Sequence, residues 1–188
     1  MVFQTASAPC CHSDRYTAQS DARVPCRTAK SVCPANQPQE RTMSRPAVAP
    51  PQNVCFQTLL AVRVDDLNYG GHLANDAVLR LVHEARVRWL ASLGLSELDI
   101  GGCGLIMTAA AVQYHAQAFH GDELRADTGI AQLSAVGFRL DTALVRTAGN
   151  IPVATTQCHM AAFDYPAERV RRLPHTLRER LAALAEAV

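Results

Sequence analysis

The sequence predicts an α+β domain in which one long central helix is wrapped by a five-stranded antiparallel sheet. Three observations predict it: a single long amphipathic helix pattern, one strand pattern before it, and four strand patterns after it. The four later stretches are joined by connections of only a few residues, and connections that short join antiparallel neighbours. A helix with a wide apolar stripe must bury that stripe, so we expect the sheet to cover it.

Composition excludes several classes of protein. The 188 residues suit one domain of ordinary size, and 18 Lys and Arg against 17 Asp and Glu leave a net charge of +1. That balance gives no electrostatic reason to expect binding to nucleic acid or to an anionic membrane. No apolar run approaches the ~20 residues that a transmembrane helix needs. The 7 cysteines include no Cys-x-x-Cys pair, which favours free thiols in a reducing cytoplasm over disulfides or a zinc site.

The chain divides into three parts by composition. Residues 1–52 are rich in Pro, Ser, Thr, Ala and Gln and lack hydrophobic periodicity, so we expect a disordered extension. Residues 53–166 carry the patterns of the folded domain, and residues 167–188 form a basic tail with a short helix. Met43 begins the run Met-Ser-Arg-Pro shortly before the ordered pattern, which leads to the hypothesis that translation starts there.

The elements of the domain follow in order. Residues 55–64 alternate bulky and polar side chains, which is typical of a strand with one buried face. Residues 74–93 repeat apolar side chains at three- and four-residue steps, with Asn75 or Asp76 as the expected N-cap and Gly94 just after the last turn. Further strands are expected at 105–116, 123–133, 137–146 and 152–163, and a last short helix at 178–187.

A polar segment at residues 65–76 lies between the first strand and the helix and is the candidate site. It gathers carboxylates, carboxamides, an imidazole and a Gly-Gly pair within a few residues. The start of a helix offers free backbone N–H donors and the positive end of the helix dipole. The sequence therefore indicates that this segment serves chemistry rather than packing.

The order of motifs resembles one family. Three motifs are similar in order and spacing to those of the hotdog-fold acyl-CoA thioesterases of the 4-hydroxybenzoyl-CoA thioesterase type: Asn68-Tyr69-Gly70-Gly71-His72-Leu73-Ala74-Asn75, then His83-Glu84-Ala85-Arg86 in the helix, then Tyr114 followed by Gly121-Asp122-Glu123-Leu124. The resemblance covers residues 56–164. It implies the hotdog fold and hydrolysis of acyl-CoA or a related acyl thioester, without a metal or redox cofactor.

The resemblance also implies roles for individual residues, with one departure. The catalytic Asp of the best-studied members falls on Asn68 here, and a carboxamide serves neither as general base nor as nucleophile. The carboxylate is then expected from Glu84 or Asp66, while His72 polarises the carbonyl or orients the water. The free amides of residues 71–75 are expected to donate to the oxyanion. The residues expected to bind the substrate are Gly70, Gly71, Asn75 and Tyr114.

Each of these assignments has a structural alternative. Asn75 and Asp76 fit helix caps, and the Gly pair fits a tight turn. Glu84 fits ion pairs at four-residue spacing with Arg80 and Arg88. His72 fits a turn histidine whose hydrogen bonds are satisfied.

Two other functions stay open on the sequence alone. Asp66-Leu67-Asn68 followed by His72 is similar to the segment of hotdog-fold enoyl-CoA hydratases, which would make the protein a lyase, although the usual Pro is absent. The replacement of the family Asp by Asn68 also fits a non-catalytic protein that only binds acyl thioesters.

Self-association is expected from the predicted architecture. One sheet covers only one side of the helix and leaves its edge strands unpaired. Pairing with a second copy protects such an edge, so we expect a homodimer or a homotetramer. Three arginines after the last strand fit either contacts to the phosphates of coenzyme A or a solvated basic tail: Arg169, Arg171 and Arg172.

Overall fold

The structure is a computed structural model that describes residues 47–186. Its elements are β1 (Phe56–Ala61), a 3-10 turn η1 (Val64–Asp66), α1 (Asn75–Ser92), β2 (Gly104–Tyr114), β3 (Glu123–Ala131), β4 (Gly137–Arg146), β5 (Ile151–Asp164), β6 (Arg169–Val170) and α2 (His175–Glu186). The predicted disordered extension lies outside these residues up to position 46, as does the proposed start at Met43.

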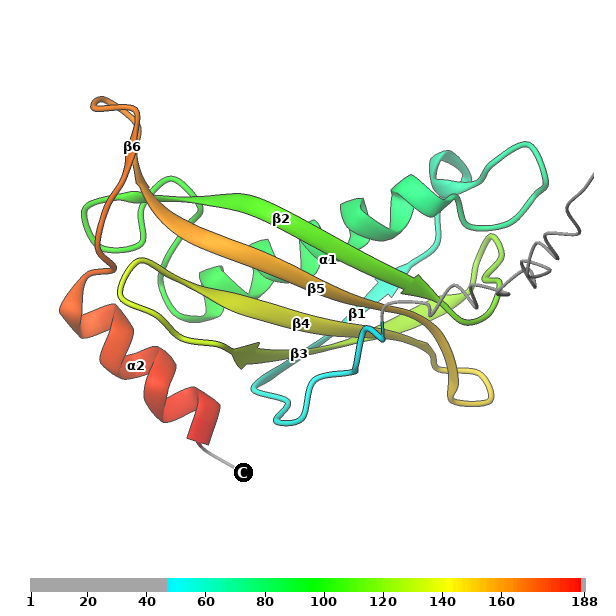
Figure 1. The fold of residues 1–188 in the computed structure, drawn as a ribbon. Helices are drawn as coiled ribbons and strands as arrows, with labels where there is room; N and C mark the ends of the chain where they lie inside the picture. Colours follow the sequence, from blue (N-terminus) through cyan, green and yellow to red (C-terminus); the bar gives the residue numbers. More distant parts are fainter. Residues whose placement is uncertain (1–46, 187–188) are drawn as a thin grey trace, which may run out of the picture. The chain divides into compact units, whose positions relative to one another are not determined.

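The strands form one antiparallel sheet in the order β1-β3-β4-β5-β2, and the two-residue β6 pairs with the end of β5. Helix α1 runs along one face of this sheet (Figure 1). The predicted α+β class with its antiparallel sheet on a helix is confirmed, and the arrangement is that of the hotdog fold. Strand β6 was not predicted, because two exposed residues in a basic loop leave no strand pattern in the sequence.

Helix α1 buries the apolar stripe that the sequence predicts. Ala77, Val78, Leu81, Val82, Ala85 and Trp89 are all buried, and the Trp89 ring meets the edge of Phe138 from β4 with ring centroids 5.9 Å apart. Gly94 follows the helix with φ 72°, a conformation that glycine adopts without strain, and so ends the helix as predicted. These contacts hold α1 along the face of the sheet.

The predicted N-cap of α1 is wrong. The cap residue is Ala74, whose side chain accepts no hydrogen bond, and Asn75 and Asp76 are the first two helical residues. Asp76 instead forms an ion pair with Arg80, with 2.6 Å between Oδ2 and Nη1. The first turn of α1 therefore lacks a side-chain cap, and its amide N–H groups have no acceptor within the helix.

Residues 47–54 lie across the face of the sheet opposite α1. Val48 is buried, and its N–H donates to Oε1 of Gln113 on β2 at 3.0 Å. The backbone at Asn53 passes close to Gly129, where a Cβ atom would lie 2.1 Å from the Asn53 carbonyl oxygen. The other end of this segment contacts helix α2, because the Asn53 side chain donates to the carbonyl of Ala185 at 2.7 Å.

Candidate active site

A tight turn carries the candidate site. The N–H of Gly71 donates to the Asn68 carbonyl at 3.0 Å, and the N–H of Gly70 donates to the Asn68 side-chain oxygen at 2.8 Å. Gly71 has φ 77°, which a residue with a Cβ rarely adopts. Asn68 thus uses its carbonyl and its carboxamide oxygen to shape the turn, and the Gly pair supplies the conformation that the turn requires.

The imidazole of His72 lies next to the Asn68 side chain. Its Nδ1 is 3.2 Å from the carbonyl oxygen of Leu73, a group that only accepts hydrogen bonds. That contact selects the tautomer with the proton on Nδ1 and leaves a lone pair on Nε2. The Asn68 amide nitrogen is 3.4 Å from Nδ1 and 3.5 Å from Nε2, close enough to steady the ring but too long for a strong bond. His72 is therefore arranged to accept a proton at Nε2.

Four of the predicted site residues line one pocket at the start of α1, which we call the polar pocket. Asn68, His72, Asn75 and Tyr114 line it, and the Tyr114 hydroxyl donates to the Asn75 carbonyl at 3.0 Å. This contact joins the end of β2 to the first turn of α1. The volume is about 470 Å³, and the remaining lining residues are Leu73, His115, Ala116 and Gln117.

His115 is the site residue that the sequence reasoning did not select. It lines the polar pocket directly after Tyr114, and its Nε2 is 2.8 Å from the hydroxyl of Thr155 on β5. It lies within the strand expected at residues 105–116, where it was given no role. Its contact partner Thr155 lies 40 residues away in the sequence, so no local sequence pattern indicates the contact.

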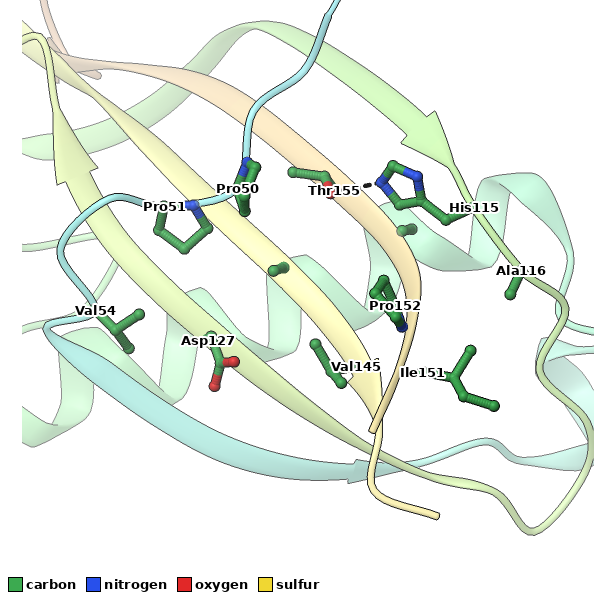
Figure 2. A pocket seen from close by; sticks show the side chains of 12 residues that line it. Pro50, Pro51, Val54, His115, Ala116, Asp127, Val145, Ile151, Pro152 and Thr155 are labelled. Atoms are coloured by element: carbon green, nitrogen blue, oxygen red, sulfur yellow. Dashed lines mark hydrogen bonds between the residues drawn. The ribbon is translucent and has the colours of Figure 1, made fainter. Parts of the chain in front are cut away.

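A second pocket, the sheet pocket, lies on the face of the sheet opposite α1 (Figure 2). It measures about 620 Å³ and is mostly apolar, with Pro50 and Pro51 on one side and Val145, Ile151 and Pro152 on another. His115 and Ala116 line both pockets, and Figure 2 shows the His115 ring beside Thr155. The two pockets thus meet at the end of β2.

Asp66 lies outside both pockets. It is 3% exposed, and its carboxylate accepts the N–H of Arg63 at 3.0 Å and lies 3.6 Å from the Arg80 guanidinium. Its backbone carbonyl accepts the N–H of Ala74 at 2.8 Å. Asp66 therefore fastens the beginning of the His72 loop to its end and to α1, and its carboxylate faces arginine rather than the polar pocket.

Glu84 also lies outside the polar pocket. Its carboxylate contacts Arg88 at 2.5 Å, as the sequence alternative predicted, and Arg63 at 3.5 Å. The predicted contact with Arg80 is wrong, because Arg80 turns toward Asp76 at 2.6 Å. Arg88 continues to the carbonyl of Leu59 at 2.8 Å, so this charge network ties α1 to β1.

Three of the five amides predicted as oxyanion donors are already engaged. The N–H of Gly71 donates within its turn, that of Leu73 donates to the carbonyl of Ala118 at 2.8 Å, and that of Ala74 donates to Asp66. The N–H of Asn75 begins the uncapped helix, where intrahelical acceptors are absent. Of the five amides, those of His72 and Asn75 are left for an oxyanion, and that of Asn75 lies at the first turn of α1.

The fold and the site together define a hotdog protein with a small polar pocket at the start of its long helix. The family model of the Thioesterase-like superfamily matches residues 62–181. The chain belongs to this superfamily. A search of curated protein sequences gave no significant match.

Solved structures with the same fold include several thioesterases. A 1,4-dihydroxy-2-naphthoyl-CoA thioesterase from Synechocystis is 24% identical, with a TM-score of 0.61 over 71% of this chain and 96% of its own. A thioesterase from Thermus thermophilus, solved with coenzyme A and zinc, is 21% identical, with a TM-score of 0.62 over 73% and 99%. A gentisyl-coenzyme A thioesterase is 20% identical, with a TM-score of 0.60 over 67% and 99%.

Proposed function

We propose that this protein is a thioester hydrolase that cleaves acyl-CoA or a closely related acyl thioester. The observation that carries the proposal is the placement of His72 in a pocket at the uncapped start of α1, in a chain of the Thioesterase-like superfamily. With the proton on Nδ1, its Nε2 keeps a lone pair that meets the Asn68 amide nitrogen only at 3.5 Å. The solved structures named for naphthoyl-CoA and gentisyl-CoA hydrolysis, and the one with bound coenzyme A, add support for a coenzyme A thioester.

In the proposed mechanism His72 is the general base. A water oxygen attacks the thioester carbonyl carbon while Nε2 of His72 takes the water proton. The resulting oxyanion accepts hydrogen bonds from amides at the first turn of α1, beginning with Asn75, where the helix dipole is also favourable. The carbon–sulfur bond then breaks, and the imidazolium returns the proton to the departing thiolate. The products are a carboxylic acid and the free thiol.

Asn68 and Asp66 act as positioning residues in this proposal. Asn68 builds the turn and holds the His72 ring at its side, while Asp66 closes the loop through Ala74 and Arg80. Gly70 lies against this ring, since a Cβ there would be 3.3 Å from Nε2 of His72. Glu84 stabilises the contact between α1 and β1 and takes no part in the chemistry.

We also propose that the protein forms a homodimer through β2. This strand lies at one edge of the sheet, is eleven residues long, and is exposed from Met107 to Ala111. An edge strand has unpaired backbone N–H and C=O groups, and pairing with the same strand of a second copy satisfies these groups in both chains. The free thiols of Cys55, Cys103 and Cys158 suit the reducing cytoplasm in which we place the protein.

The test is a thiol-release assay across short, long, branched and aromatic acyl-CoAs with the wild-type chain, His72→Ala and His83→Ala. His83→Ala is the matched control, because it removes an exposed imidazole outside the polar pocket. We expect release by the wild type and His83→Ala and its loss in His72→Ala. Hydration of enoyl-CoA without thiol release would instead establish the lyase.

A protein that only binds acyl thioesters is the second candidate, favoured by the carboxamide at Asn68. Calorimetric titration with a non-hydrolysable acyl-CoA ether separates the two. Tight binding by a wild-type protein that releases no thiol from any acyl-CoA in the panel would establish binding alone and end the proposal of hydrolysis.

A further inference from the structure

The sheet pocket takes part in no step of the proposed chemistry, although it is the larger of the two pockets at the end of β2. We propose that it holds the apolar end of a long aliphatic acyl chain whose thioester lies at His72 in the polar pocket. This inference rests on the proposed thioester hydrolysis, and it names the class of acyl group that the protein hydrolyses.

The floor of the sheet pocket belongs to one row of residues that runs across the sheet. The strand registers place five residues side by side on the face opposite α1: Gln57, Asp127, Ala143, Thr155 and Gln113. The middle three line the pocket, and the two outer members are engaged, since Gln57 donates to Asp127 at 2.8 Å and Gln113 accepts the N–H of Val48 at 3.0 Å. Ala143 at the centre carries only a methyl group, so the space above it is left open.

The walls of the sheet pocket are apolar and come from two separate parts of the chain. The segment that crosses the sheet supplies Pro50, Pro51 and Val54 on one side (Figure 2). The turn between β4 and β5 supplies Val145, Ile151 and Pro152 on the other. Each methylene group that such walls remove from water strengthens binding about fourfold.

The charges around the sheet pocket favour an acyl chain over the coenzyme A moiety. The lining belongs wholly to the described part of the chain and includes neither Arg nor Lys, so it offers no cation to a phosphate. Its one carboxylate, Asp127, is bound by the Arg125 guanidinium at 2.9 Å and by Gln57. An uncharged apolar group therefore suits the sheet pocket, whereas the carboxamides of the polar pocket suit the thioester and the polar arm of coenzyme A.

One acyl chain can occupy both pockets by passing around the end of β2. Tyr114 and His115 are neighbours that point to opposite faces, since the Tyr114 hydroxyl meets the first turn of α1 and His115 meets Thr155. His115 and Ala116 line both pockets and follow the last residue of β2, beyond the edge that we propose to pair with a second copy.

The thickness of the sheet sets the length that the chain must have. The side-chain layers on the two faces of a sheet lie roughly 10 Å apart. An extended chain advances roughly 1.2 Å per bond, so about eight bonds are needed to pass from one layer to the other. Saturated chains longer than octanoyl therefore reach the sheet pocket and are flexible enough to turn around the strand end, whereas a rigid aromatic acyl group stays in the polar pocket.

The first experiment measures KM for thiol release by the wild type with acetyl-, octanoyl-, lauroyl- and benzoyl-CoA. We expect KM to change little from acetyl to octanoyl and to fall about tenfold or more at lauroyl, because two buried methylene groups already suffice for that factor. Benzoyl-CoA should resemble acetyl-CoA. A KM for benzoyl-CoA as low as that for lauroyl-CoA would overturn the inference, as would equal values for octanoyl- and lauroyl-CoA.

The second experiment changes the size of the sheet pocket. Ala143→Phe fills it, so the ratio of KM for lauroyl-CoA to KM for acetyl-CoA should rise about tenfold or more. Ile151→Ala widens it and should move the lowest KM to a longer chain, which keeps the inference testable if Ala143→Phe does not fold. Ala148→Phe, in the exposed turn after β4, is the matched control and should keep the wild-type ratio. An unchanged chain-length preference in Ala143→Phe or Ile151→Ala would overturn the inference.

Calorimetric titration distinguishes failure of this inference from failure of the proposed hydrolysis. The probes are the non-hydrolysable thioethers S-ethyl-CoA and S-dodecyl-CoA. The wild type should bind S-dodecyl-CoA about tenfold or more tightly, and Ala143→Phe should lose most of that preference. Equal affinity of the wild type for both thioethers would overturn the acyl pocket. The expected preference in a protein that releases no thiol would support the pocket and overturn the hydrolysis.

Discussion

Two histidines near α1 differ in the groups that surround them. His83 lies within the helix, and its Nε2 is 2.7 Å from the carboxylate of Glu97, which also contacts Arg86 at 2.6 Å. His72 lies before the helix, has a carbonyl and a carboxamide beside it, and lines a pocket. The His–carboxylate pair, which is the arrangement often found in active sites, thus lies outside both the polar pocket and the sheet pocket.

The difference shows that a hydrogen-bonded acid and base are not sufficient evidence of catalysis. Burial alone would raise the pKa of Glu97, but the hydrogen bonds and charges of Arg86 and His83 outweigh burial and hold that pKa below its ordinary value. Such a carboxylate stabilises the loop after α1, where the Glu97 carbonyl also accepts the N–H of Leu105 at 2.7 Å. A catalytic base needs instead a lone pair beside a space for substrate, which is the role that we propose for His72 in the polar pocket.

The largest expected effect is that of replacing His72 by alanine, compared with the same replacement at His83. His72→Ala should lower kcat for thiol release by roughly 10²–10⁴-fold, the usual contribution of a general base. His83→Ala should leave kcat within about twofold, because His83 contacts only the Glu97 cluster. Steady-state thiol release with one acyl-CoA measures both, with circular dichroism to confirm folding. A larger loss of kcat in His83→Ala than in His72→Ala would contradict the assignment of His72 as the general base.

The second-largest effect is expected at Asp66, which holds the His72 loop in place through its contacts with Arg63 and Arg80. Asp66→Asn removes a buried charge that faces Arg63 and Arg80, and we expect a loss of about 1–3 kcal/mol in unfolding free energy. Thiol release should fall about tenfold through misplacement of His72, while the shape of its pH profile stays that of the wild type. Urea unfolding and a pH–rate series measure the two effects. Loss of one limb of the pH profile would show that Asp66 itself exchanges the proton.

The sequence predicted the helix and the turn that carries His72 better than it predicted the contacts between distant residues around them. The stripe from Val78 to Trp89 places α1 because burial follows helical periodicity, and the neighbours Asn68 and His72 share a turn because they are close in sequence. The contact of His115 with Thr155 and the ion pair of Asp66 with Arg80 join distant positions. No local pattern specifies such contacts, so the inward direction of the Asp66 carboxylate became evident only from the packing of the helix on the loop.

A third prediction uses pH to test the structural role of the His83 cluster. Because the folded pKa of Glu97 is lowered, its ionised form stabilises the fold above the ordinary carboxyl range, and that stabilisation is lost as pH falls through the folded pKa. Glu97→Gln should therefore lower the unfolding free energy near neutral pH by about 1 kcal/mol. The difference from the wild type should shrink in acid, while thiol release at neutral pH changes less than about twofold. Denaturant unfolding at a series of pH values provides the measurement, and a difference that grows in acid would contradict the assigned role.

The smallest expected effect is that of Glu84→Gln. Glu84 is a partly exposed member of the network with Arg88 and Arg63, and pairs of this kind on a helix contribute only about 0.3–0.5 kcal/mol. Because its carboxylate lies outside the polar pocket, kcat and KM for acyl-CoA should stay within about twofold of the wild type.

This variant is also the sharpest test of where the base lies. The resemblance to the family left Glu84 on α1 as an alternative source of the carboxylate. If Glu84→Gln abolished thiol release while His72→Ala retained it, the base would be a helix carboxylate, and the His72 pocket would serve only to bind the thioester. Arg88→Gln is the control, since it breaks the same ion pair from the other side and leaves the carboxylate in place. A loss confined to Glu84→Gln would identify the carboxylate itself, whereas an equal small loss in both variants would reflect only the weakened contact of α1 with β1.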